Sequence, residues 1–401
     1  MASDPTPMAR DLTPPSAAGR TLAVRVCSRC VMDTTDPDIS FDAGGTCNHC
    51  RTSDRLMAVQ RRSAARSGGL PALANRIKAS GAEREYDSVI GLSGGVDSSY
   101  VAFLAREMGL RPLAVHFDNG WNSELAVENI QRVVEGCGLD LMTYVIDWAE
   151  FRDLQRAFFR ASVIDIELIT DNAILAAMVN LTAEHGIRYV LSGANKATEL
   201  GLPSAWVWNK TDWKNIQAIH AKFGSVPLRT FPHLSAWRWL AIRALRRNME
   251  MVEPLNLVEY RRGEAAAFLA REFGWRDYGG KHYESIFTRF YQRYILPTKF
   301  GVDKRKVHLS SLIRNGELTR DQALARLAEP LYSPEELAVE RDFVLKKLGF
   351  SNAEFDEIMA SPPVPHDAYP SDGRRVDRLR GLFRLAQTAR GWRASQSPHD
   401  G

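Results

Sequence analysis

The stretch Ser93–Ser99 reads SGGVDSS and follows an apolar run, Tyr86–Leu92, that is typical of a β-strand. Two adjacent glycines let the backbone turn tightly and approach a ligand. The unpaired amides of such a loop, and of a helix that follows it, donate hydrogen bonds to phosphate oxygens. Asp97 is expected to hold Mg²⁺, because a carboxylate cannot itself attract phosphate. The candidate phosphate-binding residues are Ser93, Gly94, Gly95, Asp97, Ser98 and Ser99. The alternative is an ordinary serine- and glycine-rich turn.

Four of the five cysteines form a second candidate site, made of two CxxC pairs. This spacing is typical of a closed, structural four-thiolate zinc site, which supplies folding energy to a short module. Chance placement of core cysteines is the alternative. His49 could replace one thiolate, but its position inside the second pair favours a role beside the ligands or in solvent. The fifth cysteine, Cys137, is expected to be a small buried side chain. The expected zinc ligands are Cys27, Cys30, Cys47 and Cys50.

Alternating strands and helices must position the SGGVDSS loop. Apolar runs predict strands at 86–92, 112–117, 141–146 and 188–192, and helical patterns lie at 98–108, 124–135 and 170–183. Such alternation implies right-handed crossovers and a parallel sheet covered on both faces. Ligands bind such α/β sheets at the carboxyl ends of the strands. From about Gly201 the alternation stops and helices are predicted, with helix starts at Thr319 and Ser333.

The composition favours an enzyme over a nucleic-acid or membrane protein. The 52 basic residues nearly cancel 48 acidic ones, which leaves a net charge of +4 and makes nucleic acid an unlikely partner. No run approaches the roughly 18 to 20 apolar residues of a membrane span. The Pro- and Ser-rich leader has no apolar core of a secretory signal. We therefore expect a cytoplasmic enzyme.

A basic and aromatic segment, 279–311, follows in the helical region. The helical face formed by Tyr283, Phe287, Phe290, Tyr291 and Tyr294 is expected to be core. The cations around it suit an anionic ligand such as a carboxylate or a sugar diphosphate. The alternative for 304–306 is a solvated turn.

The SGGVDSS loop resembles the PP-loop of the ATP-pyrophosphatase superfamily over residues 86–200. It lacks the lysine of GxxxxGK[ST] loops. The resemblance implies cleavage of ATP between the α- and β-phosphates and a HUP-type, Rossmann-like sheet. It also implies that further strand-end residues bind ATP, with Glu199 as a second Mg²⁺ ligand. Those residues are His116, Phe117, Asp118, Gly193 and Asn195. As the alternative, Phe117 is core and residues 118–120 are a turn.

The order of the CxxC pairs, the loop, SGANKATE at 192–199 and the segment 279–311 is similar to the N-acetyl sugar amidotransferases. The likeness runs from Cys27 to Pro362. It implies an enzyme of lipopolysaccharide O-antigen or nonulosonic-acid biosynthesis that converts an acetamido into an acetamidino group, with ATP, Mg²⁺ and Zn²⁺. No glutaminase signature is visible, so the resemblance implies ammonia from a separate glutaminase subunit with a cyclase-like partner.

In this hypothesis the acetamido oxygen attacks the α-phosphorus, and ammonia then displaces AMP. A cation stabilises the phosphate, and a base accepts a proton from ammonia. The cation is sought among Lys281, Lys299, Lys304 and Arg305, and the base is His282 or Glu284. One alternative is a tRNA-modifying thiolase, which normally needs catalytic cysteines after the loop. Another is a non-catalytic zinc and nucleotide-binding module, which would leave Asp97 idle.

The expected organisation has six parts. These are a disordered leader (1–22), a zinc-ribbon-like module (23–52), a helical connector (53–84), the PP-loop domain (85–200), a substrate-binding, mainly helical region (201–362) and a tail (363–401) with a basic helix at 374–387.

Overall fold

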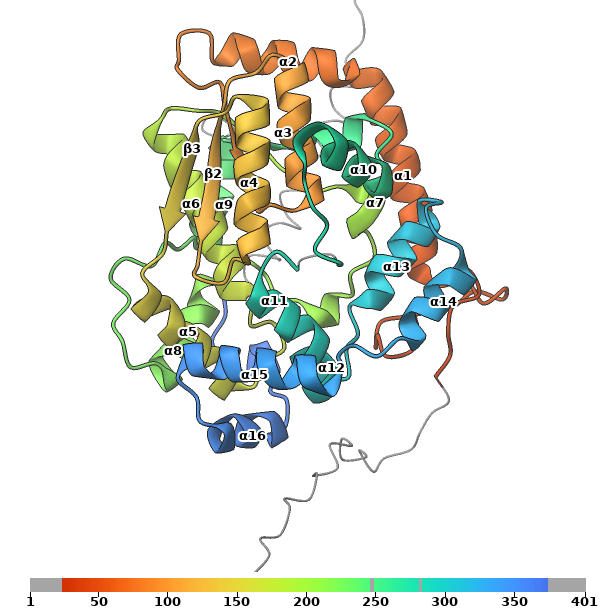
Figure 1. The fold of residues 1–401 in the computed structure, drawn as a ribbon, viewed down its shortest axis with the longest axis vertical. Helices are drawn as coiled ribbons and strands as arrows, with labels where there is room; N and C mark the ends of the chain where they lie inside the picture. Colours follow the sequence, from red (N-terminus) through yellow and green to blue (C-terminus); the bar gives the residue numbers. More distant parts are fainter. Residues whose placement is uncertain (1–23, 246–248, 281–282, 374–401) are drawn as a thin grey trace, which may run out of the picture.

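The structure is a computed structural model that describes residues 24–245, 249–280 and 283–373 (Figure 1). The expected leader, 1–22, and the basic helix expected at 374–387 lie outside the described residues. Two candidate catalytic residues, Lys281 and His282, do so as well.

A parallel five-stranded sheet with the order β3-β2-β1-β4-β5 forms the centre of the α/β fold. The chain runs outward from β1 through β2 to β3, then returns to the other side of β1 for β4 and β5. The four predicted strands are confirmed, and a fifth, β5, lies beyond residue 201, where no strand was predicted. Its three residues are too few to show a period. The strands are β1 (Ser88–Gly91), β2 (Pro112–Asp118), β3 (Leu141–Val145), β4 (Tyr189–Leu191) and β5 (Glu250–Val252).

Helices cover both faces of this sheet, as predicted. Ile90 points to one face, where α3 (Val96–Glu107), α4 (Glu124–Cys137) and α10 (Arg262–Phe273) complete a core. Val89 points to the other face and packs with Leu181 of α6 (Leu168–Glu184). This division follows from the alternation of side chains along a strand. The SGGVDSS loop lies between the end of β1 and the amino end of α3.

The remaining helices form a layer below the carboxyl ends of the strands (Figure 1). Phe287, Phe290 and Tyr291 lie in its core, which confirms the predicted aromatic face, while Tyr283 and Tyr294 are partly buried. Thr319 and Ser333 both form capping boxes at helix starts. The helices are α5 (Trp148–Ala161), α8 (Trp213–Phe223), α11 (Ile286–Phe290), a π-helical turn (Tyr291–Ile295), α12 (Leu296–Phe300), α13 (Arg305–Arg314), α14 (Arg320–Ala328), α15 (Pro334–Leu348) and α16 (Asn352–Ala360). Helix α9 (Ala236–Leu245) instead packs on α6 beside the sheet.

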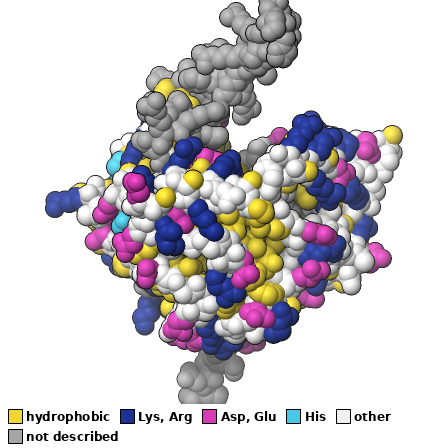
Figure 2. Space-filling view, turned by 90° about the horizontal axis from the view of Figure 1, so that it is seen from above, with side chains coloured by type: hydrophobic (Ala, Val, Ile, Leu, Met, Phe, Trp, Pro, Cys, Tyr) yellow, Lys and Arg dark blue, Asp and Glu magenta, His cyan; other side chains and the backbone are white. Residues whose placement is uncertain are grey.

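Two helices join the cysteine module to the sheet. The long helix α1 (Asn48–Ser67) begins inside the module, and α2 (Gly69–Ser80) follows it, so the expected connector is helical. Short turns complete the fold: α7 (Lys196–Glu199) and 3₁₀ turns at Ser204–Trp206, Pro254–Leu257 and His366–Ala368. None of the helices in the described ranges is long and apolar enough to span a bilayer. On the face seen in Figure 2, charges of both signs are interspersed around a hollow with hydrophobic side chains.

A buried histidine fastens the segment after α16 to the helical layer. His366 is 2% exposed, stacks on Trp208 and makes hydrogen bonds to Asn215 and to the amide of Asp165. Burial lowers the pKa of His366 to about 4. In the unfolded chain this pKa is about 6.5. The neutral form is therefore favoured by folding, and its contribution is complete above pH 6.5 and lost as the pH falls towards 4.

We therefore predict that His366→Gln flattens the acid side of the stability profile. Between pH 7.5 and pH 5 the native protein should lose about 2 kcal/mol more stability than the variant. Urea unfolding of both proteins at the two pH values measures this difference. Parallel losses would contradict it, and comparing the two proteins cancels the titration of every other group.

Candidate functional site

Three adjoining cavities lie between the sheet and the helical layer, and two of them are at the carboxyl ends of the central strands. The first, called the nucleotide cavity, has a volume of about 500 Å³ and is lined by the ends of β1, β2 and β4 and by α6. This volume lies within the range of small-molecule sites. Its place between β1 and β4 is the point where the strand order reverses, at which α/β sheets bind ligands.

The nucleotide cavity has an apolar floor, to which α6 contributes Ile174, Leu175 and Met178. Phe117 lines it and stacks on Tyr144, with 5.5 Å between ring centroids. His116 also lines it, and its Nδ1 donates to the carbonyl of Leu92 at 3.2 Å while Nε2 accepts from the Asn122 amide at 3.0 Å. These contacts fix the orientation of the imidazole ring. With its apolar floor and aromatic wall, the cavity suits an adenine base and ribose.

A smaller cavity of about 220 Å³ surrounds the SGGVDSS loop and shares Gly91, Ser93, Gly193 and Glu284 with the nucleotide cavity. Gly94 has a φ of 82°, and a Cβ there would lie 2.5 Å from the carbonyl of Ala126, so only glycine fits. The Trp275 indole donates to the Gly94 carbonyl at 2.9 Å. The loop is thus held with its amides at the start of α3, which suits pyrophosphate.

Three carboxylates face the pyrophosphate cavity: Asp97, Glu199 and Glu284. The buried Tyr260 hydroxyl donates to Asp97. Burial and the nearby Asp97 raise the pKa of Tyr260, so it stays a donor. Burial and Glu284 likewise raise the pKa of Tyr278, which lines the same cavity. Two or more carboxylates beside a phosphate site fit Mg²⁺, and Asp97 and Glu199 are the residues that would hold it.

Four of the predicted ATP-binding residues lie outside the linings of these cavities: Gly94, Ser99, Asp118 and Asn195. Asp118 accepts from the Gly120 amide at 2.8 Å, as in the turn alternative. Asn195 caps α7 by accepting from Thr198, and Ser99 is buried within α3. Contacts of these four residues with ATP stay predictions.

The third cavity, of about 600 Å³, adjoins the other two and is rich in cations. It shares Gln292, Lys304 and His308 with the nucleotide cavity, and Arg262 and Tyr278 with the pyrophosphate cavity. Among its described lining residues, the cations are Arg262, Arg289, Arg293, Lys304, Arg305 and Arg326. An acidic acceptor would meet complementary charge here.

The predicted catalytic cations occupy different places. Lys304 lines both the nucleotide and the cationic cavity. Arg305 lines the latter, but it pairs with Asp303 at 2.8 Å and donates to three backbone carbonyls of residues 326–329. Lys299 donates to the carbonyls of Ile358 and Ser361 and lines none of the three cavities. Lys304 is therefore the best placed of the three.

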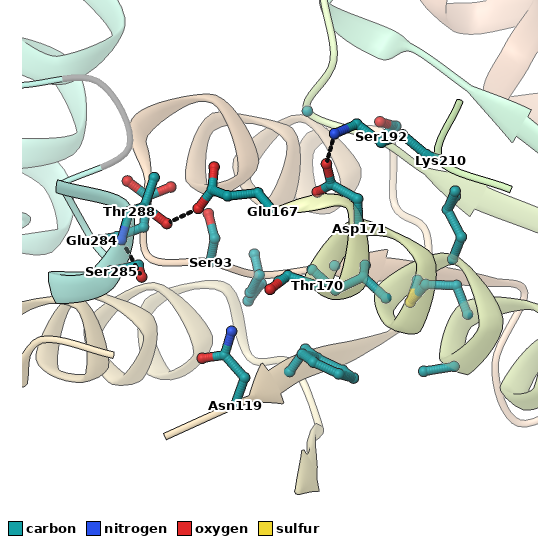
Figure 3. A pocket seen from close by; sticks show the side chains of 18 of the residues that line it. Ser93, Asn119, Glu167, Thr170, Asp171, Ser192, Lys210, Glu284, Ser285 and Thr288 are labelled. Atoms are coloured by element: carbon teal, nitrogen blue, oxygen red, sulfur yellow. Dashed lines mark hydrogen bonds and ion pairs between the residues drawn. The ribbon is translucent and has the colours of Figure 1, made fainter. Parts of the chain in front are cut away.

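The sequence interpretation missed several polar residues of the nucleotide cavity, which Figure 3 shows. Thr288 donates to Glu167 near Glu284. Farther along, Lys210 pairs with Asp165 at 2.7 Å and Asp171 at 2.9 Å. Burial opposes ionisation of Asp165, but Lys210 outweighs it and lowers the pKa of that carboxyl. No local motif marks these residues, because they come from segments without a recognisable pattern.

The four cysteines converge as predicted, with their sulfur atoms within 4.8 Å of one another and each residue fully buried. Cys30 and Cys47 Sγ lie 3.7 Å apart, close to the roughly 3.8 Å implied by a tetrahedron with zinc–sulfur bonds of about 2.3 Å. The hydrogen bond with Cys30 raises the pKa of Cys47, because two thiolates this close repel each other. Four thiolates therefore need a cation here, and the donor set fits Zn²⁺. His49 instead contacts Asp36, at 2.6 Å.

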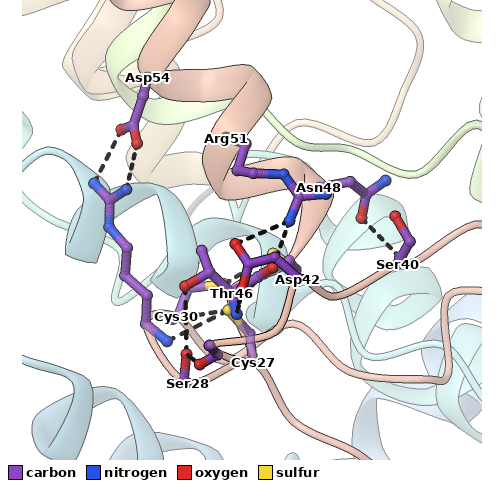
Figure 4. A network of polar contacts seen from close by, with 12 residues as sticks. Cys27, Ser28, Cys30, Ser40, Asp42, Thr46, Asn48, Arg51 and Asp54 are labelled. Atoms are coloured by element: carbon purple, nitrogen blue, oxygen red, sulfur yellow. Dashed lines mark hydrogen bonds and ion pairs between the residues drawn. The ribbon is translucent and has the colours of Figure 1, made fainter.

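Polar contacts brace this module, including a bidentate pair between Arg29 and Asp54 (Figure 4). It also docks on α13 and α14. Arg320 of α14 donates to the carbonyls of Cys27 and Cys30, and Val31 packs with Leu309 of α13. The module thus supports the helix that follows Lys304.

Gly91 supplies a direct test of the nucleotide cavity. A Cβ added to it would meet no atom within 4 Å, although the residue lines the cavity. We predict that Gly91→Val leaves the fold intact and weakens ATP binding roughly ten- to a hundredfold, because the new methyl groups overfill the ligand space. Titration calorimetry with ATP and thermal unfolding measure the two quantities.

The matched control is Gly44→Val, which adds the same side chain at an exposed loop where the nearest atom is 3.5 Å from the new Cβ. It should bind ATP like the native chain. Unchanged ATP affinity in Gly91→Val would place the adenosine elsewhere.

Comparisons with known proteins identify two matching family models. Residues 284–382 match "LPS biosynthesis protein WbpG-like, C-terminal domain", and residues 87–200 match "Asparagine synthase". No curated protein matches the chain. Solved structures with a similar fold include NMN synthetase from Francisella tularensis (14% identity, 70% of this chain and 94% of that chain, TM-score 0.33). NH3-dependent NAD synthetase from Campylobacter jejuni in complex with nitrate is also similar (16% identity, 70% and 95%, TM-score 0.30).

Proposed function

We propose that this chain, which belongs to the WbpG-like family within the PP-loop ATP pyrophosphatases, is an amidotransferase that acts on an N-acetyl sugar. Its enzyme class is an ATP-pyrophosphatase-type C–N ligase. The proposed reaction replaces the acetamido oxygen of the sugar by nitrogen, in the assembly of a bacterial surface polysaccharide or of a nonulosonic acid.

The observation that carries the proposal is the meeting of three cavities beside Ser93, Glu284 and Lys304. One suits adenosine, one suits pyrophosphate, and the third offers cations to an acidic acceptor. ATP spanning the first two would have its α-phosphorus at their junction, near Ser93. An acceptor in the third would reach the same point, so the arrangement favours transfer of AMP to an acceptor oxygen.

The chemistry has two steps. The acetamido oxygen bonds to the α-phosphorus, and the bond to the bridging oxygen breaks, so pyrophosphate leaves with the electron pair. Ammonia then attacks the imidate carbon, AMP leaves, and a proton is lost. Mg²⁺, when bound, would neutralise charge on the phosphates. The loop amides and Ser93 hold pyrophosphate, Lys304 stabilises the α-phosphate, and Glu284 accepts the proton.

The nitrogen source in this proposal is a separate glutaminase that works with a cyclase-like protein. Support comes from the cysteines, none of which suits the nucleophile of a cysteine-dependent glutaminase. Four of the five form the cluster, and burial raises the pKa of the fifth, Cys137, to about 11, which leaves little reactive thiolate. The same observation disfavours a thiolase. Ammonium alone should therefore support turnover, and glutamine alone should not.

A pyrophosphate-release assay tests the proposal. The purified chain is incubated with MgATP, ammonium and a panel of N-acetyl sugars, both neutral and acidic, the latter free or nucleoside-diphosphate-linked. We expect AMP and pyrophosphate to form in equal amounts with an acidic sugar and little with neutral ones. An activity seen with tRNA and absent with every sugar would favour the thiolase. ADP as the main product would overturn both.

A further inference from the structure

The pyrophosphate cavity contains a cation that no sequence motif marks. Arg262 is the first residue of α10 and lines this cavity together with Ser93, Asp97 and Glu199. Among the described residues of the lining, it is the only one with a cationic side chain. The SGGVDSS loop itself carries no lysine.

The Arg262 side chain has a buried donor without an acceptor among the described residues. Its Nε is buried and makes no hydrogen bond to any residue that the structure describes. The neighbouring Arg261 differs, because it pairs with Glu259 at 3.4 Å and Glu264 at 3.7 Å. A buried donor without an acceptor is costly, so such a group in a cavity indicates that a ligand supplies the acceptor.

Packing fixes the position of Arg262 relative to the loop. Helix α10 buries Ala265 and Leu269 against the same core as Val101 of α3. Because α3 begins within the SGGVDSS loop, this packing holds the first turns of α3 and α10 together beside the cavity. Tyr260, two residues before Arg262, donates to Asp97 of the loop and strengthens this link.

We propose that Arg262 binds the β- and γ-phosphates of ATP and stabilises pyrophosphate as it leaves. The negative charge that develops when the bridging P–O bond breaks would meet a guanidinium whose planar donors match phosphate oxygens. The three carboxylates of the cavity favour such a cation beside Mg²⁺, since carboxylates and phosphates repel each other. The assignment rests on the ATP cleavage of the proposed function, but not on the identity of the acceptor.

Binding of three probes to the full-length protein tests this role. In the presence of Mg²⁺, Arg262→Gln should weaken the binding of ATP and of inorganic pyrophosphate roughly ten- to a hundredfold. AMP lacks both phosphates, so its affinity should change less than about threefold. Arg262→Lys keeps the charge without the planar donors, so its affinity for pyrophosphate should lie between those of the native protein and Arg262→Gln.

The matched control is Arg261→Gln, which removes the same charge one residue away, outside the lining of the pyrophosphate cavity. It should bind all three probes like the native chain. Unchanged pyrophosphate binding in Arg262→Gln would overturn the proposal, as would an equal loss of AMP and pyrophosphate binding. A native unfolding temperature confirms that the variant is folded. Failure of every N-acetyl sugar as acceptor would leave this binding result intact.

Discussion

Asp97→Asn should lower ATP-dependent pyrophosphate release by roughly a hundred- to a thousandfold, with little change in stability. Asp97 is in the first turn of α3, lines the pyrophosphate cavity and accepts from Tyr260. The amide keeps an oxygen for that hydrogen bond but removes the negative charge that suits Mg²⁺. Pyrophosphate release measured over a range of Mg²⁺ concentrations should show that the midpoint of activation moves upward.

The control is Asp147→Asn. Asp147 also follows the carboxyl end of a strand and begins a helix, where its side chain accepts from Glu150 at 2.9 Å. Asparagine caps helices as well as aspartate does, and Asp147 lies outside the linings of all three cavities. Its activity should be close to native. Native Mg²⁺ dependence in Asp97→Asn would remove Asp97 from the proposed metal site.

Cys47→Ser should abolish stoichiometric zinc binding and destabilise residues 24–50 together with α13 and α14. A structural zinc contributes on the order of 10 kcal/mol to small modules, far more than their burial provides. Elemental analysis of native protein should find about one zinc per chain, as a single tetrahedral site requires. Hydrogen exchange should be faster in the module and in both helices, because Val31 packs on α13 and Arg320 of α14 donates to the module.

Cys137→Ser serves as the comparison, since this cysteine is also buried but lies outside the cluster. It should keep its zinc and lose at most about 1 kcal/mol of stability, as ordinary core changes do. Native zinc content in Cys47→Ser would show that the cluster has another role.

The two candidate sites were largely predictable because each is written in a short stretch of sequence. Seven consecutive residues place amides, hydroxyls and Asp97 at one helix start, and two CxxC pairs bring four sulfur atoms together. The strands were predictable for a related reason: β1, β2 and β4 are buried along most of their length and are mainly apolar.

The remaining parts depend on contacts between distant segments. Tyr260 reaches Asp97 across 163 positions of sequence, and Arg262 enters the same cavity because α10 packs on α3. The strand β5 is too short for a period to show. Charge alone does not identify the catalytic cation. The sequence makes Lys299 and Arg305 candidates equal to Lys304, yet both donate to backbone carbonyls in the structure. Only tertiary packing distinguishes such residues from Lys304.

The origin of the oxygen in AMP tests the central claim most directly. An N-acetyl sugar that the enzyme accepts is labelled with ¹⁸O in its acetamido carbonyl and converted with ATP and ammonium. Mass spectrometry then measures the ¹⁸O content of AMP and of pyrophosphate. If that oxygen attacks the α-phosphorus, AMP should carry one ¹⁸O per turnover and pyrophosphate none. Unlabelled AMP, or label in pyrophosphate or inorganic phosphate, would contradict adenylation of the acetamido group.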